Sequence, residues 1–211
     1  MGLLSKFFSN TRKPEGFLGK MMVNSMNSGH AIMADWGLSH LTANPSSIAE
    51  LGCGGGRNAV ELMKKYPLAT LTALDYSEVS VEKTKKTAKA EIESGRCTVV
   101  QGDVSKLPFA DASFDLTTAF ETVYFWNLRE SFAEVYRVLK SGGSFMIVNE
   151  SNGENEADEK WTQIIDGMKI YTAEQLADTL REVGFAEVII HKHEKKPWIC
   201  LITVKRQEDI Q

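Results

Sequence analysis

Short apolar runs alternate with amphipathic segments along most of this chain. Five runs rich in apolar and β-branched residues end in glycine or polar residues, at Ile48–Leu51, Ala69–Asp75, Thr98–Asp103, Phe114–Phe120 and Ser144–Glu150. This pattern predicts strands. Four segments between or after them have helical spacing and helix-ending signals. They are expected at Arg57–Tyr66, from Ser77 to near Gly95, around Phe132, Val135 and Leu139 up to Ser141-Gly142-Gly143, and from the capping box at Thr172 to Gly184.

Strands separated by helices imply parallel strands joined by right-handed crossovers, in a sheet covered on both faces. The end of the chain differs, because Ala186–His193 and Trp198–Arg206 are joined by Glu194-Lys195-Lys196-Pro197 with no helix between them. That arrangement predicts a hairpin, so one terminal strand should run antiparallel. The predicted fold is a three-layer α/β sandwich.

Two segments lie outside this alternation. Residues 1–45 precede the first strand, and we expect them to form an N-terminal helical lid on a main domain spanning residues 46–211. Residues 151–171 separate the fifth strand from the next helix. Trp161, Ile165, Met168 and Tyr171 recur there at helical intervals, which favours a short amphipathic segment covering a substrate.

A glycine-rich loop follows the first predicted strand and opens a helix, in the sequence Glu50-Leu51-Gly52-Cys53-Gly54-Gly55-Gly56-Arg57-Asn58. Glycines permit a sharp turn and a close approach of ligand to backbone, and the helix start offers unpaired N–H groups. The glycines at 52, 54 and 56 depart from the G-x-G-x-x-G dinucleotide pattern, since Arg57 stands where the last glycine belongs. A tight turn that binds nothing is the alternative interpretation.

Polar residues also end the neighbouring strands. Asp75 ends the second strand, Gly102-Asp103-Val104 the third, and Ala119-Phe120-Glu121 the fourth. Open α/β sheets bind ligands at the carboxyl ends of their strands. Asp75 is placed to accept hydrogen bonds from two ribose hydroxyls, and Asp103 from an adenine amino group. Taken singly, either aspartate could simply cap a loop.

These motifs together resemble the class I S-adenosylmethionine-dependent methyltransferases of the small-molecule type. The resemblance covers about residues 46–206 and rests on AELGCGGGRN, LDYS, QGDVSKLPFADASFD and EVYRVLKSGGSF. It implies a Rossmann-like, seven-stranded sheet of order 3-2-1-4-5-7-6 with strand 7 antiparallel, and S-adenosylmethionine as cofactor. It implies further that the methionine part is lined by Glu50, Gly52, Cys53, Gly54 and Gly56. Asp75 would hold the ribose beside Tyr76, Gly102, Asp103 and Val104 would meet the adenine, and Ala119 and Phe120 would lie near the amino-acid end.

The residues around the transferred methyl group are expected from two places. Met22, Met26 and His30 share one helical face, so they predict either a lid with His30 directed at the acceptor or an ordinary packed helix. Trp36 would help close that lid. Glu121 and Tyr124 follow the fourth strand and are candidates to orient or deprotonate the acceptor, unless they only pack there. Methyl transfer from a sulfonium depends mainly on positioning, so an obvious base is not required.

Charge and cysteine content limit the binding partners that we expect. The 211 residues carry a formal charge of −4, which disfavours non-specific binding to nucleic acid or an anionic membrane. The three cysteines have no CxxC spacing, and His191 and His193 have no third ligand in view, so we expect a reducing, cytoplasmic location and no metal. Phe7 and Phe8 would suit a homodimer contact. Alternative functions are an NAD(P)-dependent oxidoreductase and a non-catalytic protein that binds adenosylmethionine.

Overall fold

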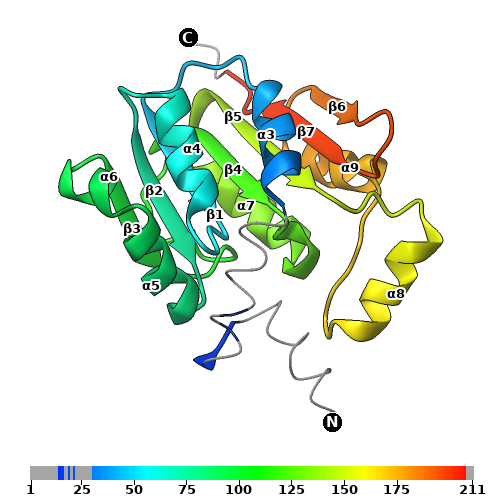
Figure 1. The fold of residues 1–211 in the computed structure, drawn as a ribbon. Coiled ribbons are helices and arrows are strands. Elements are labelled where there is room, and N and C mark those ends of the chain that lie inside the picture. Colours follow the sequence, from blue (N-terminus) through cyan, green and yellow to red (C-terminus); the bar gives the residue numbers. More distant parts are fainter. Residues whose placement is uncertain (1–13, 17–18, 20, 22–29, 208–211) are drawn as a thin grey trace.

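The computed structural model describes residues 14–16, 19, 21 and 30–207 of the 211. Its centre is a seven-stranded sheet of order β3-β2-β1-β4-β5-β7-β6 (Figure 1). The strands are β1 (Ser47–Leu51), β2 (Thr70–Asp75), β3 (Cys97–Gln101), β4 (Phe114–Phe120), β5 (Leu139–Asn149), β6 (Val188–Lys192) and β7 (Ile199–Val204). The predicted strand order is confirmed, and every predicted strand overlaps an observed one.

Only the terminal hairpin departs from parallel pairing in this sheet. β1 pairs in parallel with β2 and β4, and the pairs β2–β3 and β4–β5 are also parallel. β7 runs antiparallel to both β5 and β6, as the sequence predicts for a hairpin with no intervening helix. The carboxyl ends of β1 to β5 therefore all lie at one edge of the sheet, which is where the candidate site forms.

Helices cover both faces of the sheet and complete the three-layer sandwich. α3 (Ala31–Ser39) and α4 (Arg57–Lys65) pack on one face, through buried residues such as Met33 and Leu62 that join strand residues in a single core. On the other face α7 (Leu128–Val138) and α9 (Ala173–Val183) bury Phe132 and Leu176 in a second core. α9 begins at the predicted capping box, in which Thr172 and Gln175 cap each other.

Two element boundaries differ from the sequence prediction. The helix expected from Ser77 to Gly95 is split into α5 (Glu78–Thr87) and α6 (Lys89–Glu93), because the buried Ala88 leaves helical backbone at φ −96° and ψ 27°. The helix expected to end at Ser141-Gly142-Gly143 ends at Val138. β5 already begins at Leu139, since Gly142 and Gly143 exchange backbone hydrogen bonds with Lys205 beyond β7.

The described residues include parts of the two extra segments. Met22, Met26, Phe7 and Phe8 lie outside the described residues, so the lid helix and the homodimer contact stay predictions. α3 starts directly after His30 and is held against α4 by a bidentate ion pair in which Arg57 Nη2 lies 2.6 and 2.7 Å from the Asp35 carboxylate oxygens. Within 151–171 the helix α8 (Glu156–Ile164) stops before the expected Ile165, Met168 and Tyr171.

Trp36 does not face the sheet edge where the site forms. On α3 it packs against His40, His193 and Trp198, with ring centroids 4.9, 5.5 and 6.1 Å away. His191 stacks on His40 at 4.0 Å, so the two strand histidines belong to an aromatic cluster beside α3.

Candidate active site

A cavity opens at the carboxyl ends of the strands, next to the point where the strand order reverses between β1 and β4. Such switch points are the usual binding crevices of open α/β sheets. The lining combines the glycine loop, the ends of β2, β3 and β4, and residues from outside the sheet. Its members are Pro14, His30, Gly52, Cys53, Gly54, Gly55, Arg57, Asn58, Leu74, Asp75, Tyr76, Ser80, Gly102, Asp103, Val104, Phe120, Glu121, Thr122, Tyr124, Phe125, Trp126 and Met168.

The glycine loop needs glycine for two different reasons. Gly52 has φ +79°, and a Cβ there would collide with the Thr122 side chain. The backbone of the loop therefore packs directly against a side chain of the segment after β4. Gly54 has φ +53°, and the space beside its Cα is open. Because Gly54 lines the cavity, a side chain at this position would occupy room that a ligand can use.

Asp75 connects the loop to the end of β2. Its side chain is 6% exposed, and its two oxygens accept hydrogen bonds of 2.9 Å each, from the N–H of Gly54 and the N–H of Ser77. Burial raises the pKa of Asp75, and these hydrogen bonds act against the rise. A carboxylate has about four lone-pair sites, so capacity for further donors remains.

The end of β3 is more open than the end of β2. Asp103 is exposed, and one of its oxygens accepts 2.8 Å hydrogen bonds from the backbone N–H and the hydroxyl of Ser105. Val104 and the partly exposed Tyr76 lie on the same wall of the cavity. This side of the cavity thus presents an acceptor, an apolar side chain and an aromatic ring to a ligand.

Three residues that the resemblance assigns to the cofactor are absent from the lining of this cavity. Gly56 starts α4 and packs closely against Thr84, and Ala119 is fully buried in β4. Glu50 is 1% exposed in β1, and its Oε2 has no hydrogen-bond partner among the described residues. Burial, and next the charge of Asp75, raise the pKa of Glu50 to about 8.

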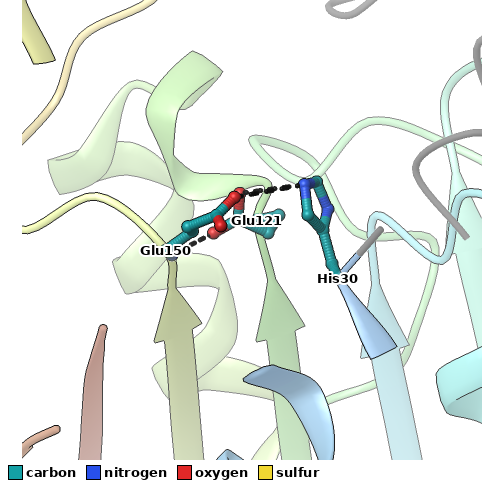
Figure 2. A group of neighbouring side chains, drawn as sticks. All are labelled: His30, Glu121 and Glu150. Carbon is teal, nitrogen blue, oxygen red and sulfur yellow. Dashed lines mark hydrogen bonds and ion pairs between the residues drawn. The ribbon is translucent and has the colours of Figure 1, made fainter. Parts of the chain in front are cut away.

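At the other end of the cavity His30, Glu121 and Glu150 converge (Figure 2). Glu121 follows β4, Glu150 follows β5, and His30 precedes α3. The Nε2 atom of His30 lies 3.4 Å from Glu150 Oε2 and 3.9 Å from Glu121 Oε2. The predicted candidates His30 and Glu121 are therefore neighbours, although 90 residues separate them along the chain.

Glu121 is held by its surroundings. Its Oε1 accepts hydrogen bonds from the Tyr124 hydroxyl at 3.0 Å and from the backbone N–H of Glu150, and its backbone has φ +56°, unusual for a side-chain-bearing residue. Burial raises the pKa of Glu121, and the nearby His30 opposes that rise. Burial, and then the charge of Glu121, raise the pKa of Tyr124, whose oxygen accepts a 3.1 Å hydrogen bond from the Ser151 N–H.

Several lining residues escape sequence reasoning. Asn58 ends the glycine motif, which assigns it no role, and no motif marks Ser80 or Thr122; each of the three follows a strand end within a few residues. Glu150 directly follows β5, and the rule applied to the other strand ends could have found it.

The chain matches the family model of a methyltransferase domain over residues 49–147. These residues include the glycine loop, Asp75, Asp103, Glu121 and Tyr124. Two curated relatives extend the similarity beyond the matched region. An O-methyltransferase of Pyrenophora dematioidea is 27% identical over 154 residues, 70% of this chain and 57% of that protein. A ubiquinone/menaquinone biosynthesis C-methyltransferase of Dinoroseobacter shibae is 28% identical over 161 residues, 75% of this chain and 63% of that protein.

The family match, these relatives and the fold together support a class I S-adenosylmethionine-dependent methyltransferase. This is a family of enzymes whose cofactor is S-adenosylmethionine. The fold agrees: the structure of human N-acetylserotonin methyltransferase in complex with S-adenosylmethionine superposes with a TM-score of 0.76 at 16% identity, covering 90% of this chain and 56% of that one. The chain spans less than two thirds of the length of the two curated relatives described above.

The residues that line the cavity fit S-adenosylmethionine. Gly54 leaves open space beside its backbone at the start of α4, Asp103 offers a solvent-exposed carboxylate, and Tyr76 offers an aromatic face. Among the described residues, no helix is both long enough and apolar enough to cross a membrane. The cysteines Cys53, Cys97 and Cys200 are buried and free of disulfides.

Proposed function

We propose that this protein transfers the methyl group of S-adenosylmethionine to a small-molecule acceptor held at the His30 end of the cavity. The observation that carries the proposal is the continuity of a single cavity. It joins the glycine loop and strand ends on one side to the cluster of His30, Glu121 and Tyr124 on the other.

We assign the nucleoside side to residues that line the cavity. Asp75 would accept from the ribose hydroxyls, Asp103 and Val104 would meet the adenine edge, and Tyr76 would pack beside it. The backbone of Gly52, Cys53 and Gly54 would lie along the methionine part. When bound, the cofactor supplies an electrophilic methyl group on a sulfonium, which leaves as a neutral thioether.

The chain's own contribution is to align the acceptor. Glu121, Tyr124 and His30 would orient its nucleophilic group, because all three line the cavity and lie next to one another. Positioning of this kind supplies on the order of 7–11 kcal/mol toward a two-partner reaction. The aromatic run Tyr124-Phe125-Trp126 favours an apolar or planar acceptor body.

The lid predictions also enter this proposal. Pro14, from the N-terminal segment, and Met168, from the 151–171 segment, both line the cavity, which supports a cover built from those two parts of the chain. A relative that acts on oxygen and another that acts on carbon leave the acceptor atom open. A cytoplasmic location and the lack of nucleic-acid and membrane partners stay predictions.

Calorimetric titration of the full chain with S-adenosylmethionine tests the binding half of the proposal, with NADH and NADPH as comparison ligands. We expect binding of S-adenosylmethionine alone, and its loss in Gly54→Val, because the new side chain would fill the cavity. A second assay incubates the protein with methyl-labelled cofactor and fractionated metabolite extracts. Cofactor binding without labelled product from any extract would leave a non-catalytic binding protein and refute the transfer.

A further inference from the structure

The His30 end of the cavity contains more polar capacity than its own hydrogen bonds use. Oε1 of Glu121 is taken by Tyr124 and by the backbone of Glu150, while its Oε2 faces His30. Oε2 of Glu150 also faces His30. Within the part of the chain that the structure describes, the His30 ring makes no hydrogen bond with either carboxylate.

The same end carries unbalanced negative charge. No lysine or arginine among the described residues forms an ion pair with Glu121 or Glu150, and His30 is the one basic side chain that approaches them there. Glu121 is largely buried, with 17% of its side chain exposed, so its charge has little water to stabilise it. A cation between these two carboxylates and the imidazole would balance that charge.

The donor atoms of the three residues lie close enough together to converge on one metal ion. Nε2 of His30 and one oxygen from each glutamate all lie within 4.8 Å of one another. With metal–ligand bonds of about 2.0–2.2 Å, neighbouring donors lie roughly 3.0–3.5 Å apart. The His30–Glu150 and His30–Glu121 separations of 3.4 and 3.9 Å are close to that range.

We propose that His30, Glu121 and Glu150 form a divalent-cation site at the acceptor end of the cavity. One nitrogen and two oxygens suit Mn²⁺, Fe²⁺ or Zn²⁺. Three protein ligands leave coordination positions open, and His30 and Glu121 line the cavity, so those positions face the acceptor.

What the cation would do rests on the proposed function. The acceptor would be a molecule with a hydroxyl, carboxylate or other oxygen that binds the cation. A cation at this point lowers the pKa of a bound hydroxyl and fixes its orientation. The site would therefore favour oxygen acceptors over purely apolar ones.

The test is a titration of the chelator-treated full chain with Mn²⁺, following the free ion by its electron paramagnetic resonance signal. We expect one bound equivalent. Glu150→Gln and His30→Ala should each weaken binding at least tenfold, in line with the effect of disturbing a metal site. Glu82→Gln on α5 removes an exposed carboxylate that does not line the cavity and should leave binding unchanged. Thermal melting of each variant confirms folding, and Glu150 is 48% exposed, so its variant should fold.

The outcomes separate the two proposals. Absence of Mn²⁺ binding, or binding that Glu150→Gln and His30→Ala leave unchanged, overturns the cation site. Binding of butylammonium that depends on Glu150, without Mn²⁺ binding, also overturns it and indicates an amine acceptor. Calorimetry with S-adenosylmethionine in the presence of chelator tests the proposed function by itself, so its failure is read independently of the metal.

Discussion

Replacing Glu50 by glutamine should change how the stability of this protein depends on pH. Glu50 is 1% exposed, its Oε2 lacks a partner among the described residues, and its pKa is raised to about 8. In the unfolded chain a glutamate has a pKa near 4.5. Between these values the folded protein keeps the proton that the unfolded chain releases. The free energy of unfolding therefore falls as the pH rises through this window.

The size of the effect follows from the two pKa values. Each pH unit inside the window costs about 1.4 kcal/mol, so the loss from Glu50 between about pH 5.5 and pH 8 is roughly 3 kcal/mol. For a chain of this length that corresponds to a decrease of about 6–12 °C in melting temperature. The negative charge of the neighbouring Asp75 contributes to the raised pKa of Glu50, and therefore to this loss of stability.

The assay compares melting temperatures of the wild-type protein and Glu50→Gln across pH 5.5 to 8. Glutamine has the shape of protonated glutamate but does not titrate. The melting temperature of the variant should therefore increase steadily relative to that of the wild type as the pH rises. If the buried carboxamide itself lowers stability, the whole curve of melting temperature against pH shifts by a constant amount and its slope is unchanged. Glu130→Gln, an exposed change on α7, serves as control and should follow the wild type. Parallel curves for Glu50→Gln and wild type would refute the reasoning.

Three further substitutions test the site and the core. Asp75→Asn removes a charged acceptor from the Gly54 N–H and should cost about 1–3 kcal/mol as well as weaken S-adenosylmethionine binding in calorimetry; an unchanged melting temperature would contradict the structural role of Asp75. Gly52→Ala forces a Cβ into Thr122 at φ +79° and should cost roughly 1–3 kcal/mol in urea unfolding, whereas wild-type stability would show that the loop relaxes freely. Phe132→Ala empties part of the core under α7 and should cost about 3–5 kcal/mol by denaturation, and a loss below 1 kcal/mol would mean the core collapses around it.

Local sequence signals predicted most of this fold, because a glycine or polar residue marks the end of most strands. Asp75 and Gly102 end runs of apolar residues, and parallel strands bring such ends to one edge without further information. The start of β5 could not be predicted in the same way. Residues from Lys140 to Gly143 look like a helix ending, and only their pairing with Lys205, far along the chain, draws them into the sheet.

The acceptor end was predictable only in part, for a similar reason. His30 meets Glu121 because α3 docks on the sheet, where Gly37 lies so close to Val148 that a Cβ would collide with it. The ion pair between Arg57 and Asp35 then fixes α3 against α4. These contacts depend on tertiary packing, and no spacing along the chain encodes them.

The carboxylates at the strand ends occupy equivalent topological positions but differ in what their oxygens do. Both oxygens of Asp75 are used by backbone N–H groups, so this residue holds the glycine loop in place before it meets any ligand. Glu121 uses one oxygen to hold Tyr124 and the chain at Glu150, and its other oxygen faces His30. The carboxylate at the end of β2 is thus engaged by the backbone of the loop, whereas polar atoms remain available at the ends of β4 and β5. Under the proposed function this asymmetry suits a fixed methyl donor and a variable acceptor, because changes at the ends of β4 and β5 would leave the contacts of Asp75 with the loop intact.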